Sequence, residues 1–383
     1  MRKIAIIGIG QTKVHEHWQR SIRDLAGEAI FAALEDANRE SVDAIFSGNM
    51  LSGLLDQQNN LGAVIADWVG FKGESVKIES ACSSGASALR AGMIAIASGE
   101  IDSAMVVGVE KMTDAAPTDV TSALATAADS DWELEQGVSF VGLNALIMRR
   151  YMHEYGWQHK DFAPFSLNSH ANAAHNPNAR LPFAISEKQY LNATMIAAPI
   201  NLMDASPTGD GAAAALIVPL DSLRGDQRAV EIAGSGAATD TISIHSRKTP
   251  LFLQAAYLSA QSAYAQAGIS LEEIDFFELH DAFSIMAALS LEACGFAEQG
   301  QGPRLGLDNE IKINHGRIPI CTMGGLKARG HPVGATGMYQ IVESVQQLRG
   351  ECGETQVEGA KVGLAQNIGG SGASIITHIL KIA

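Results

Sequence analysis

Short apolar runs alternate with amphipathic stretches along both ends of this chain. Runs of branched apolar residues are typical of buried strands, and apolar residues at helical spacing indicate helices. In the first part of the chain, the pattern predicts strands at 4–9, 42–47, 75–79 and 103–109 and helices at 22–37, 62–69 and 81–99. This alternation predicts an α/β fold in which a mostly parallel sheet is covered by helices on both faces.

The same plan returns towards the carboxyl end. There the pattern predicts strands at 209–220, 229–239, 274–279, 361–366 and 373–380 and helices at 251–267 and 334–348. A repeated strand–helix plan predicts two similar halves, each with a mostly parallel five-stranded sheet. Residues between them break the rhythm and are expected to form an inserted loop domain. The expected division is 1–112 with 206–225, then the loop domain at 113–205, then 226–383.

Cys82 is the first candidate for chemistry. It follows a predicted strand and opens the helix at 81–99, which is small and apolar on every side and is therefore expected to be buried. Backbone amides at a helix N-terminus favour a negative charge, so a thiol there is expected to have a lowered pKa and to be a good nucleophile. A buried structural cysteine is the alternative. Position alone does not decide between them.

Two histidines and a glycine-rich turn are further candidates. His280 and Asp281 stand at the end of a predicted strand, where α/β sites form, although a histidine that caps the next helix would look the same. His331 lies in GGLKARGHPVGATG, where five glycines and a proline fix the backbone around one imidazole, and this favours function. The turn AQNIGGSGAS at 365–374 is either a source of N–H donors for an oxyanion or a plain hairpin.

Composition narrows the class of protein. With 27 basic and 42 acidic residues the net charge is −15, which disfavours binding to nucleic acid or to anionic membranes. The four cysteines show no metal-ligand spacing and no disulfide framework, so we expect no metal and a reducing, cytoplasmic location. No apolar stretch is long enough to span a bilayer, and the first residues are better explained as a strand than as a signal peptide.

Five motifs together resemble the thiolase superfamily over nearly the whole chain. They are ACSSG around Cys82, SPTGDGAAA at 206–214, HDAF at 280–283, GHPVGATG at 330–337 and NIGGSG at 367–372. The pattern is most similar to archaeal and sterol-carrier-type thiolases, which also carry His-Asp in the third motif. The resemblance implies two βαβαβαββ halves stacked in five layers, αβαβα, with a loop domain that binds coenzyme A.

The resemblance also implies roles for single residues. Cys82 would take the acyl group from an acyl-CoA, and His331 would be its base. His331 and His280 would hold the thioester oxygen of the second acyl-CoA, whereas the backbone N–H groups of Cys82 and Gly369 would form the other oxyanion hole. Ser206 would contact the pantetheine arm. The thioester is the substrate and no cofactor is expected. A homodimer or homotetramer is expected, and a small zinc-ribbon/OB-fold protein is a possible partner.

One departure concerns the acid/base thiol that many thiolases use to move the α-proton. Asn367 and Ala282 stand at the two places where relatives carry it. Cys321 in PICTMGG lies ten residues before His331 and is a candidate replacement, or it only packs. The leading hypothesis is reversible formation or cleavage of a 3-oxoacyl-CoA such as acetoacetyl-CoA. The alternatives are a non-condensing acyltransferase, a retro-aldolase and a non-catalytic subunit that binds acyl-CoA beside a partner.

Overall fold

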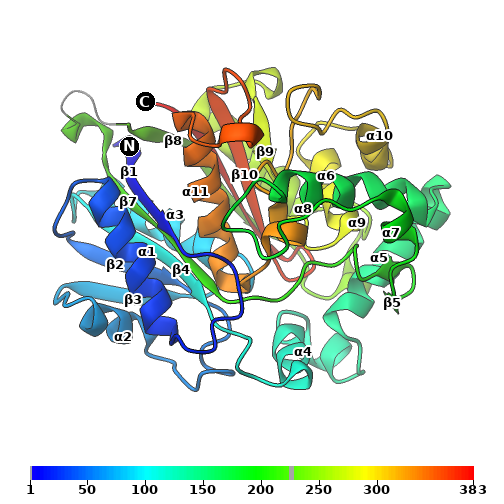
Figure 1. The fold of residues 1–383 in the computed structure, drawn as a ribbon, viewed down its shortest axis with the longest axis horizontal. Coiled ribbons are helices and arrows are strands. Elements are labelled where there is room, and N and C mark those ends of the chain that lie inside the picture. Colours follow the sequence, from blue (N-terminus) through cyan, green and yellow to red (C-terminus); the bar gives the residue numbers. More distant parts are fainter. Residues whose placement is uncertain (1, 224–227) are drawn as a thin grey trace.

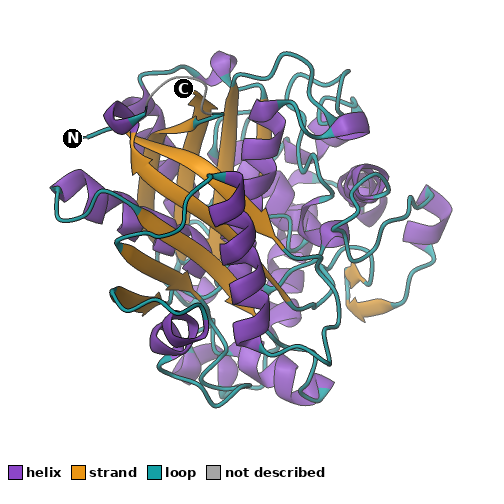
Figure 2. Ribbon diagram, turned by 60° about the vertical axis from the view of Figure 1, so that its left-hand side comes forward, coloured by secondary structure: helices purple, strands orange, loops and turns teal. Residues whose placement is uncertain are grey.

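A nine-stranded sheet runs through the molecule in the computed structural model, which describes residues 2–223 and 228–383. In spatial order its strands are β3 (Glu74–Ile78), β2 (Ala44–Gly48), β4 (Ala104–Glu110), β7 (Gly211–Pro219), β1 (Ile4–Gln11), β8 (Val230–Thr239), β11 (Ser374–Ile382), β10 (Val362–Gly369) and β9 (Phe276–Glu278). A short antiparallel pairing of β1 with β8 joins the two halves. The strands form one twisted sheet through the molecule (Figure 2).

The expectation of a mostly parallel sheet is wrong. Of the strand pairs in the described residues, only β3–β2, β2–β4 and β10–β9 are parallel, whereas the other pairings within the sheet are antiparallel. β10 and β11 are joined by a tight turn with Gly369 opposite Ser374, and such a short connection permits only an antiparallel pair. Over residues 228–383 the carboxyl half has four strands rather than five. Where a fifth strand was expected, the chain forms only one isolated β-bridge, between Phe277 and Ile320. The neighbouring Pro319 has no N–H and therefore cannot extend the pairing.

Five layers follow from where the helices pack, as expected. α1 (Ile22–Asp36) and α2 (Leu61–Trp68) cover one outer face of the amino half. α8 (Gln254–Ala267) covers the outer face of β8 and β11, with α9 (Ser284–Ala293) beside it. α3 (Ser84–Ser98) and α11 (Thr336–Arg349) lie between the halves, and α11 contacts both β7 and β10 (Figure 1, α11 in orange).

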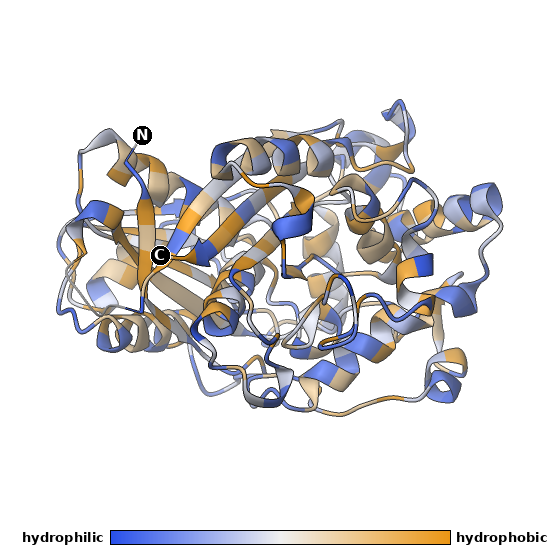
Figure 3. Ribbon diagram, turned by 90° about the horizontal axis from the view of Figure 1, so that it is seen from above, coloured by the Kyte–Doolittle hydropathy of each residue, from blue (hydrophilic) through white to orange (hydrophobic). Residues whose placement is uncertain are grey.

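The buried-helix prediction holds for only one side of α3. The helix begins at Ser84 rather than at 81, and its outward-facing Ile94 is 56% exposed. By contrast, every residue of α9 is buried, as are most residues of α11. Apolar residues concentrate in the strands (Figure 3). α11 is buried although it carries polar residues such as Gln340, Glu343 and Gln347.

Residues 113–205 are mostly helical rather than loops. They form α4 (Pro117–Ala125), α5 (Phe140–Tyr155), α6 (Ala163–Ala173), α7 (Glu187–Leu191) and the small hairpin of β5 (Met195–Ala197) and β6 (Ile200–Asn201). α10 (Gly302–Leu307) packs against α6 and α9. The expected boundary at 225/226 lies outside the described residues. Among the described residues, none of the helices combines the length and the apolar character needed to cross a bilayer.

The internal repeat extends to the contacts between the first strand and the first helix of each half. A Cβ on Gly8 or Gly10 of β1 would lie 2.2 or 2.3 Å from a carbonyl oxygen of α1. A Cβ on Gly234 or Gly236 of β8 would lie 2.2 or 1.9 Å from a carbonyl oxygen of α8. Two glycines separated by one residue therefore let each helix lie directly on its strand.

We expect Gly236→Ala to destabilise the fold, because the added methyl group would collide with the carbonyl of Ser259 and push α8 off β8. Overpacking of this kind costs about 1–3 kcal/mol, which urea unfolding would measure. Gln261→Ala on the exposed face of α8 is the matched control, with an expected change within about 0.5 kcal/mol. Equal stability of Gly236→Ala and wild type would contradict this account.

Candidate active site

A cavity of about 560 Å³ lies where the two halves and the 113–205 segment meet. Cys82, His331, Ser206 and Ala282 all line it, so four positions far apart in the sequence come together. Its opposite wall is apolar and comes from the helical segment. The wall residues are Leu124, Phe140, Val141, Leu181, Phe183, Ile196, Leu202 and Met203. This arrangement suits a thioester whose reacting end is polar and whose surroundings are dry.

Cys82 lies at the sharp bend between β3 and α3. Ala81 just before it has a left-handed backbone (φ 52°), and Ser80 forms a β-bridge with Cys82. The bend turns the thiol to the cavity wall, where the residue is only 3% exposed. The thiol is two residues ahead of the helix, rather than on its first turn as expected.

The expectation of a lowered pKa for Cys82 is wrong for this structure. Burial raises the pKa of the thiol to about 12, and the nearby Glu110 carboxylate acts in the same direction. Hydrogen bonds from the backbone N–H groups of Cys82 and Gly370 lower the pKa of the thiol, but this effect is smaller than the rise that burial causes. The thiol is therefore protonated at neutral pH and needs a base within the site to become a nucleophile.

His331 is held in the tautomer that a base requires. Its Nδ1 lies 2.6 Å from Oγ1 of Thr336, and that hydroxyl donates its own proton to the carbonyl of Pro332 at 3.2 Å. A hydroxyl has one proton, so Thr336 accepts the hydrogen bond from Nδ1–H of His331. The lone pair of His331 is then on Nε2. Threonine at the start of α11 thus prepares the imidazole to take a proton.

His280 is held in the opposite tautomer. The side-chain amide of Asn367 donates from Nδ2 to Nδ1 of His280 at 3.0 Å, which leaves the proton of His280 on Nε2. The position where relatives carry a thiol is therefore occupied by an amide that orients a histidine. With this tautomer, His280 is a hydrogen-bond donor, as an oxyanion hole requires.

The two imidazoles lie edge to face with ring centroids 5.1 Å apart. Burial lowers the pKa of His280 to about 3 and that of His331 well below its usual range. The guanidinium of Arg329 lowers both pKa values further, and the neighbouring His280 adds to the effect on His331. Both rings are consequently neutral at physiological pH, one as an acceptor and one as a donor.

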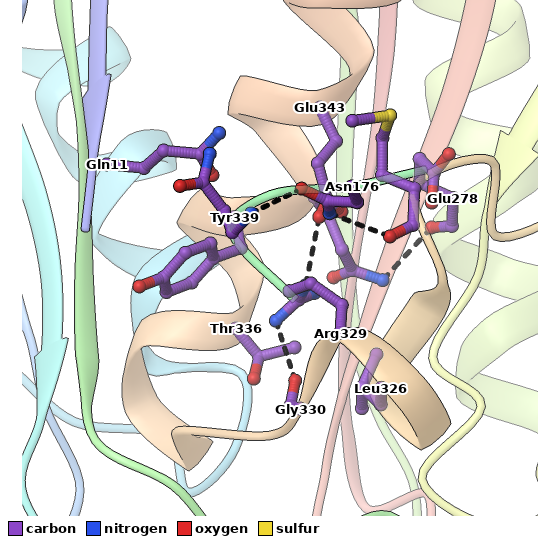
Figure 4. Close-up of polar contacts among 12 residues, drawn as sticks. Gln11, Asn176, Glu278, Leu326, Arg329, Gly330, Thr336, Tyr339 and Glu343 are labelled. Atoms are coloured by element: carbon purple, nitrogen blue, oxygen red, sulfur yellow. Dashed lines mark hydrogen bonds and ion pairs between the residues drawn. The ribbon is translucent and has the colours of Figure 1, made fainter. Parts of the chain in front are cut away.

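The Arg329 guanidinium lies in a buried cluster behind the His331 loop (Figure 4). It pairs with the Glu343 carboxylate of α11 at 3.0 Å and donates to the carbonyl of Gly330 at 2.8 Å. Its guanidinium also lies over the ring of Tyr339, 4.8 Å from the centroid. These contacts fix the backbone one residue before His331 onto the central helix.

Glu110 connects the same loop to the amino half. This carboxylate at the end of β4 is fully buried and accepts hydrogen bonds from the backbone of Met50, Leu51 and Gly334 and from Asn49 Nδ2, at 2.7–3.0 Å. Burial raises its pKa to about 7 although these donors oppose the rise. Residues of the Cys82 half and of the His331 half therefore share one anchor.

Among the remaining sequence candidates, Ser206 lines the cavity, whereas His280, Gly369 and Cys321 are not part of its lining. A Cβ on Gly369 would lie 2.4 Å from the carbonyl of Ser80, so Gly369 packs against the bend that carries Cys82. Ser206 lines the cavity, and its N–H donates to the carbonyl of Ala282 at 2.9 Å. Cys321 is fully buried outside the cavity lining, and its sulfur faces the Leu279 carbonyl at 3.9 Å.

Sequence reasoning missed three residues of the site. Glu110 ends the apolar strand β4, and a single carboxylate at the end of a buried strand could have indicated a functional residue. Thr336 is inside the GATG motif but had no stated role. Lys327, in the middle of GGLKARGHP, lines the cavity at 1% exposure. A lysine among glycines and apolar residues was the signal there.

Comparison with known proteins identifies the family. The family model "Thiolase, N-terminal domain" matches residues 4–221, and "Thiolase C-terminal domain-like" matches residues 236–382. The chain belongs to the thiolase family. This thiolase is 44% identical over 383 residues to an acetyl-CoA acetyltransferase of Methanothermobacter thermautotrophicus, with 99% of each chain covered. Identity to human sterol carrier protein 2 is 29%, over 98% of this chain and 72% of that protein.

Solved structures agree on the fold. The thiolase superposes on the structure of an "Ltp2-ChsH2(DUF35) aldolase" with a TM-score of 0.87 at 24% identity, covering 99% of this chain and 98% of that chain. An acetyl-CoA acetyltransferase from Syntrophomonas wolfei gives a TM-score of 0.76 at 18% identity, with full coverage of both chains. The predicted thiolase fold is confirmed, and the enzyme is a thiolase-type acyltransferase.

The raised pKa of Cys82 predicts how its reactivity depends on pH. The thiolate fraction rises tenfold per pH unit below the pKa, so alkylation by iodoacetamide should accelerate about tenfold per unit between about pH 7 and about pH 9. Intact-mass spectrometry would follow the adduct, with Cys82→Ala as the control for the other three cysteines. A rate that levels off near pH 8 would indicate a thiol activated in the resting state and would contradict the buried, protonated thiol.

The two tautomers predict different consequences for their partners. Thr336→Val removes the acceptor of His331 Nδ1–H, so formation of the acetyl adduct on Cys82 from acetyl-CoA should slow. Asn367→Ala should leave formation of this adduct unchanged but slow thiolysis of acetoacetyl-CoA, by no more than the roughly hundredfold that loss of a whole oxyanion donor costs. If Thr336→Val slowed only thiolysis and Asn367→Ala slowed the reaction of Cys82, the roles assigned to the two histidines would be reversed.

Proposed function

We propose that this thiolase transfers acyl groups through a thioester on Cys82 and reversibly forms or cleaves 3-oxoacyl-CoA, with acetoacetyl-CoA as the first substrate to test. The observation that carries the proposal is that Cys82 and His331 line one cavity, while the His280 ring lies edge to face against His331 and the two neutral imidazoles have opposite tautomers. The names of the archaeal relatives, acetyl-CoA acetyltransferases at 44% and 38% identity, support the substrate class.

In the first step, Nε2 of His331 takes the thiol proton while Cys82 sulfur attacks the thioester carbonyl. The backbone N–H of Cys82 and that of Gly369, next to Gly370 whose own N–H acts on the thiol, would stabilise the oxyanion. CoA then leaves with the proton from His331, and the acyl group remains on Cys82. In the second step, His331 and His280 would hold the thioester oxygen of the incoming acyl-CoA. Ser206 would contact its pantetheine arm, with the 113–205 segment as the coenzyme A domain.

The assembly is also part of the proposal. β3 is at one end of the sheet with an open edge, and Val76 on it is 38% exposed. An open edge of this kind suits pairing with a second copy, so we propose a homodimer or homotetramer built on the amino half. The structurally similar aldolase is named together with a DUF35 protein, which supports a partner protein for this chain as well. For that partner we retain the small zinc-ribbon/OB-fold protein that the family resemblance implies. The name of that complex also makes a retro-aldolase the second candidate reaction.

The decisive experiment is intact-mass spectrometry after incubation with acetyl-CoA. Wild type should gain one acetyl group, and Cys82→Ala should gain none. His331→Ala should form the adduct roughly a hundredfold more slowly, because it lacks the base. An adduct that persists in Cys82→Ala, or no adduct on wild type, would refute the acyl-enzyme and favour a non-catalytic subunit. An adduct without thiolysis of acetoacetyl-CoA would favour the non-condensing acyltransferase or the retro-aldolase.

A further inference from the structure

Lys327 is a buried amine at the wall of the active-site cavity that the steps above do not use. It lies in the turn Gly325–Arg329, just ahead of the His331 loop, and is 1% exposed. It lines the same cavity as Cys82 and His331. A buried lysine costs desolvation energy, so its place against a substrate cavity calls for a role.

The hydrogen bonds of Lys327 leave one tetrahedral position of its amine nitrogen without a protein partner among the hydrogen bonds of the described residues. Its Nζ donates to the carbonyl oxygen of Asp204 at 2.7 Å and to that of Asp281 at 3.1 Å. A neutral amine has two N–H bonds and one lone pair, and the two carbonyls account for both N–H bonds. The fourth tetrahedral position holds either the lone pair of the amine or the third proton of the ammonium. Lys327 is also one of the residues that line the cavity, so this fourth position is the one we assign to the substrate.

The amine lies beside the place where a thiol is missing. Asp281, whose carbonyl it contacts, is joined by its peptide bond to Ala282, where some relatives carry the acid/base cysteine. Ala282 also lines the cavity, and its small side chain leaves room beside the amine. The Lys327 amine is therefore a titratable group next to position 282, where alanine stands in place of the expected cysteine.

Cys321, the candidate from the sequence, has weaker geometry for this task. It is fully buried, is absent from the cavity lining, and faces the carbonyl of Leu279. Burial and the neighbouring Asp281 carboxylate raise the pKa of its thiol well above the usual value. Such a thiol has little tendency to ionise.

The charges around Lys327 come from several elements. The carboxylates of Asp281 and Asp204 and the thiol of Cys321 raise its pKa, but burial lowers it by more. His170 of α6 also lines the cavity, and Lys327 in turn lowers the pKa of that imidazole. The net lowering brings the neutral amine closer to physiological pH.

We propose that Lys327 is the acid/base that exchanges the α-proton of the second acyl-CoA, in place of the absent thiol. The proposal rests on the proposed function, since it concerns the second step on the acyl-enzyme. In condensation, the α-carbon proton moves to the lone pair of Nζ, and the enolate attacks the acyl carbonyl on Cys82. The new C–C bond forms, the C–S bond breaks, and the proton passes from the ammonium to the Cys82 sulfur. Thiolysis runs the same transfers in reverse.

The test measures the two half-reactions separately in Lys327→Met and Lys327→Arg. Methionine keeps the length without the amine, and arginine keeps the charge but exchanges no proton at neutral pH. Both variants should still form the acetyl adduct on Cys82, which also shows that the site is folded. Both should lose exchange of acetyl-CoA methyl protons with deuterated water, and thiolysis of acetoacetyl-CoA, by about 100-fold or more. Lys188→Met on the exposed surface and Cys321→Ala should match wild type in all assays.

Wild type provides a measurement that needs no substitution. Exchange by an amine base should accelerate with rising pH above neutrality, whereas a carboxylate or an imidazole of low pKa would give a flat profile. Exchange in either Lys327 variant within threefold of wild type would overturn the proposal, as would its loss in Cys321→Ala or a flat wild-type profile. These outcomes differ from failure of the proposed function, in which wild type itself would form no Cys82 adduct.

Discussion

The active site depends on one buried carboxylate that both halves of the molecule share. Glu110 binds backbone N–H groups of the loop after β2 and, from the other half, that of Gly334. A Cβ at Gly334 would lie 2.6 Å from this carboxylate, so only glycine permits the contact. The loop that carries His331 is thereby fixed to the half that carries Cys82. Four donors on one buried carboxylate form a joint that tolerates little movement, and positioning within a fraction of an ångström is what proton transfer between the two halves requires.

Burial then decides the protonation states of the site. It raises the pKa of Cys82 and lowers those of both histidines, so the resting site carries no charge on its reacting groups. Reactivity comes from the direction of hydrogen bonds. Thr336 and Asn367 impose opposite tautomers on two adjacent rings, which gives one acceptor and one donor from the same side-chain type. A neutral site also limits the charge that must be desolvated when a thioester enters the apolar cavity.

Asn367 stands where the family resemblance leads us to expect a thiol, and it lies within β10. Its amide donates to Nδ1 of His280. In the proposed condensation another group has to take the α-proton, and we propose for this step Lys327, which lines the cavity. Its two carbonyl partners belong to the segments before Ser206 and Ala282, so the amine also holds together two parts of the cavity wall.

The sequence by itself determined the main strands and helices outside 113–205, apart from α9 and α10, together with the internal repeat and the family, because these rest on local periodicity and on motifs that are contiguous in the chain. Cys82, His280 and His331 were selected as candidates for the same reason. Tertiary structure alone decided the strand directions, the tautomers and the pKa of Cys82. These depend on partners such as Thr336, Asn367 and Glu110 and on the exclusion of water. A helix N-terminus suggests an acidic thiol, but the free energy of removing the thiolate from water exceeds that local effect. Lys327 is visible in the sequence, yet only the tertiary structure shows that it lines the same cavity as Cys82 and His331.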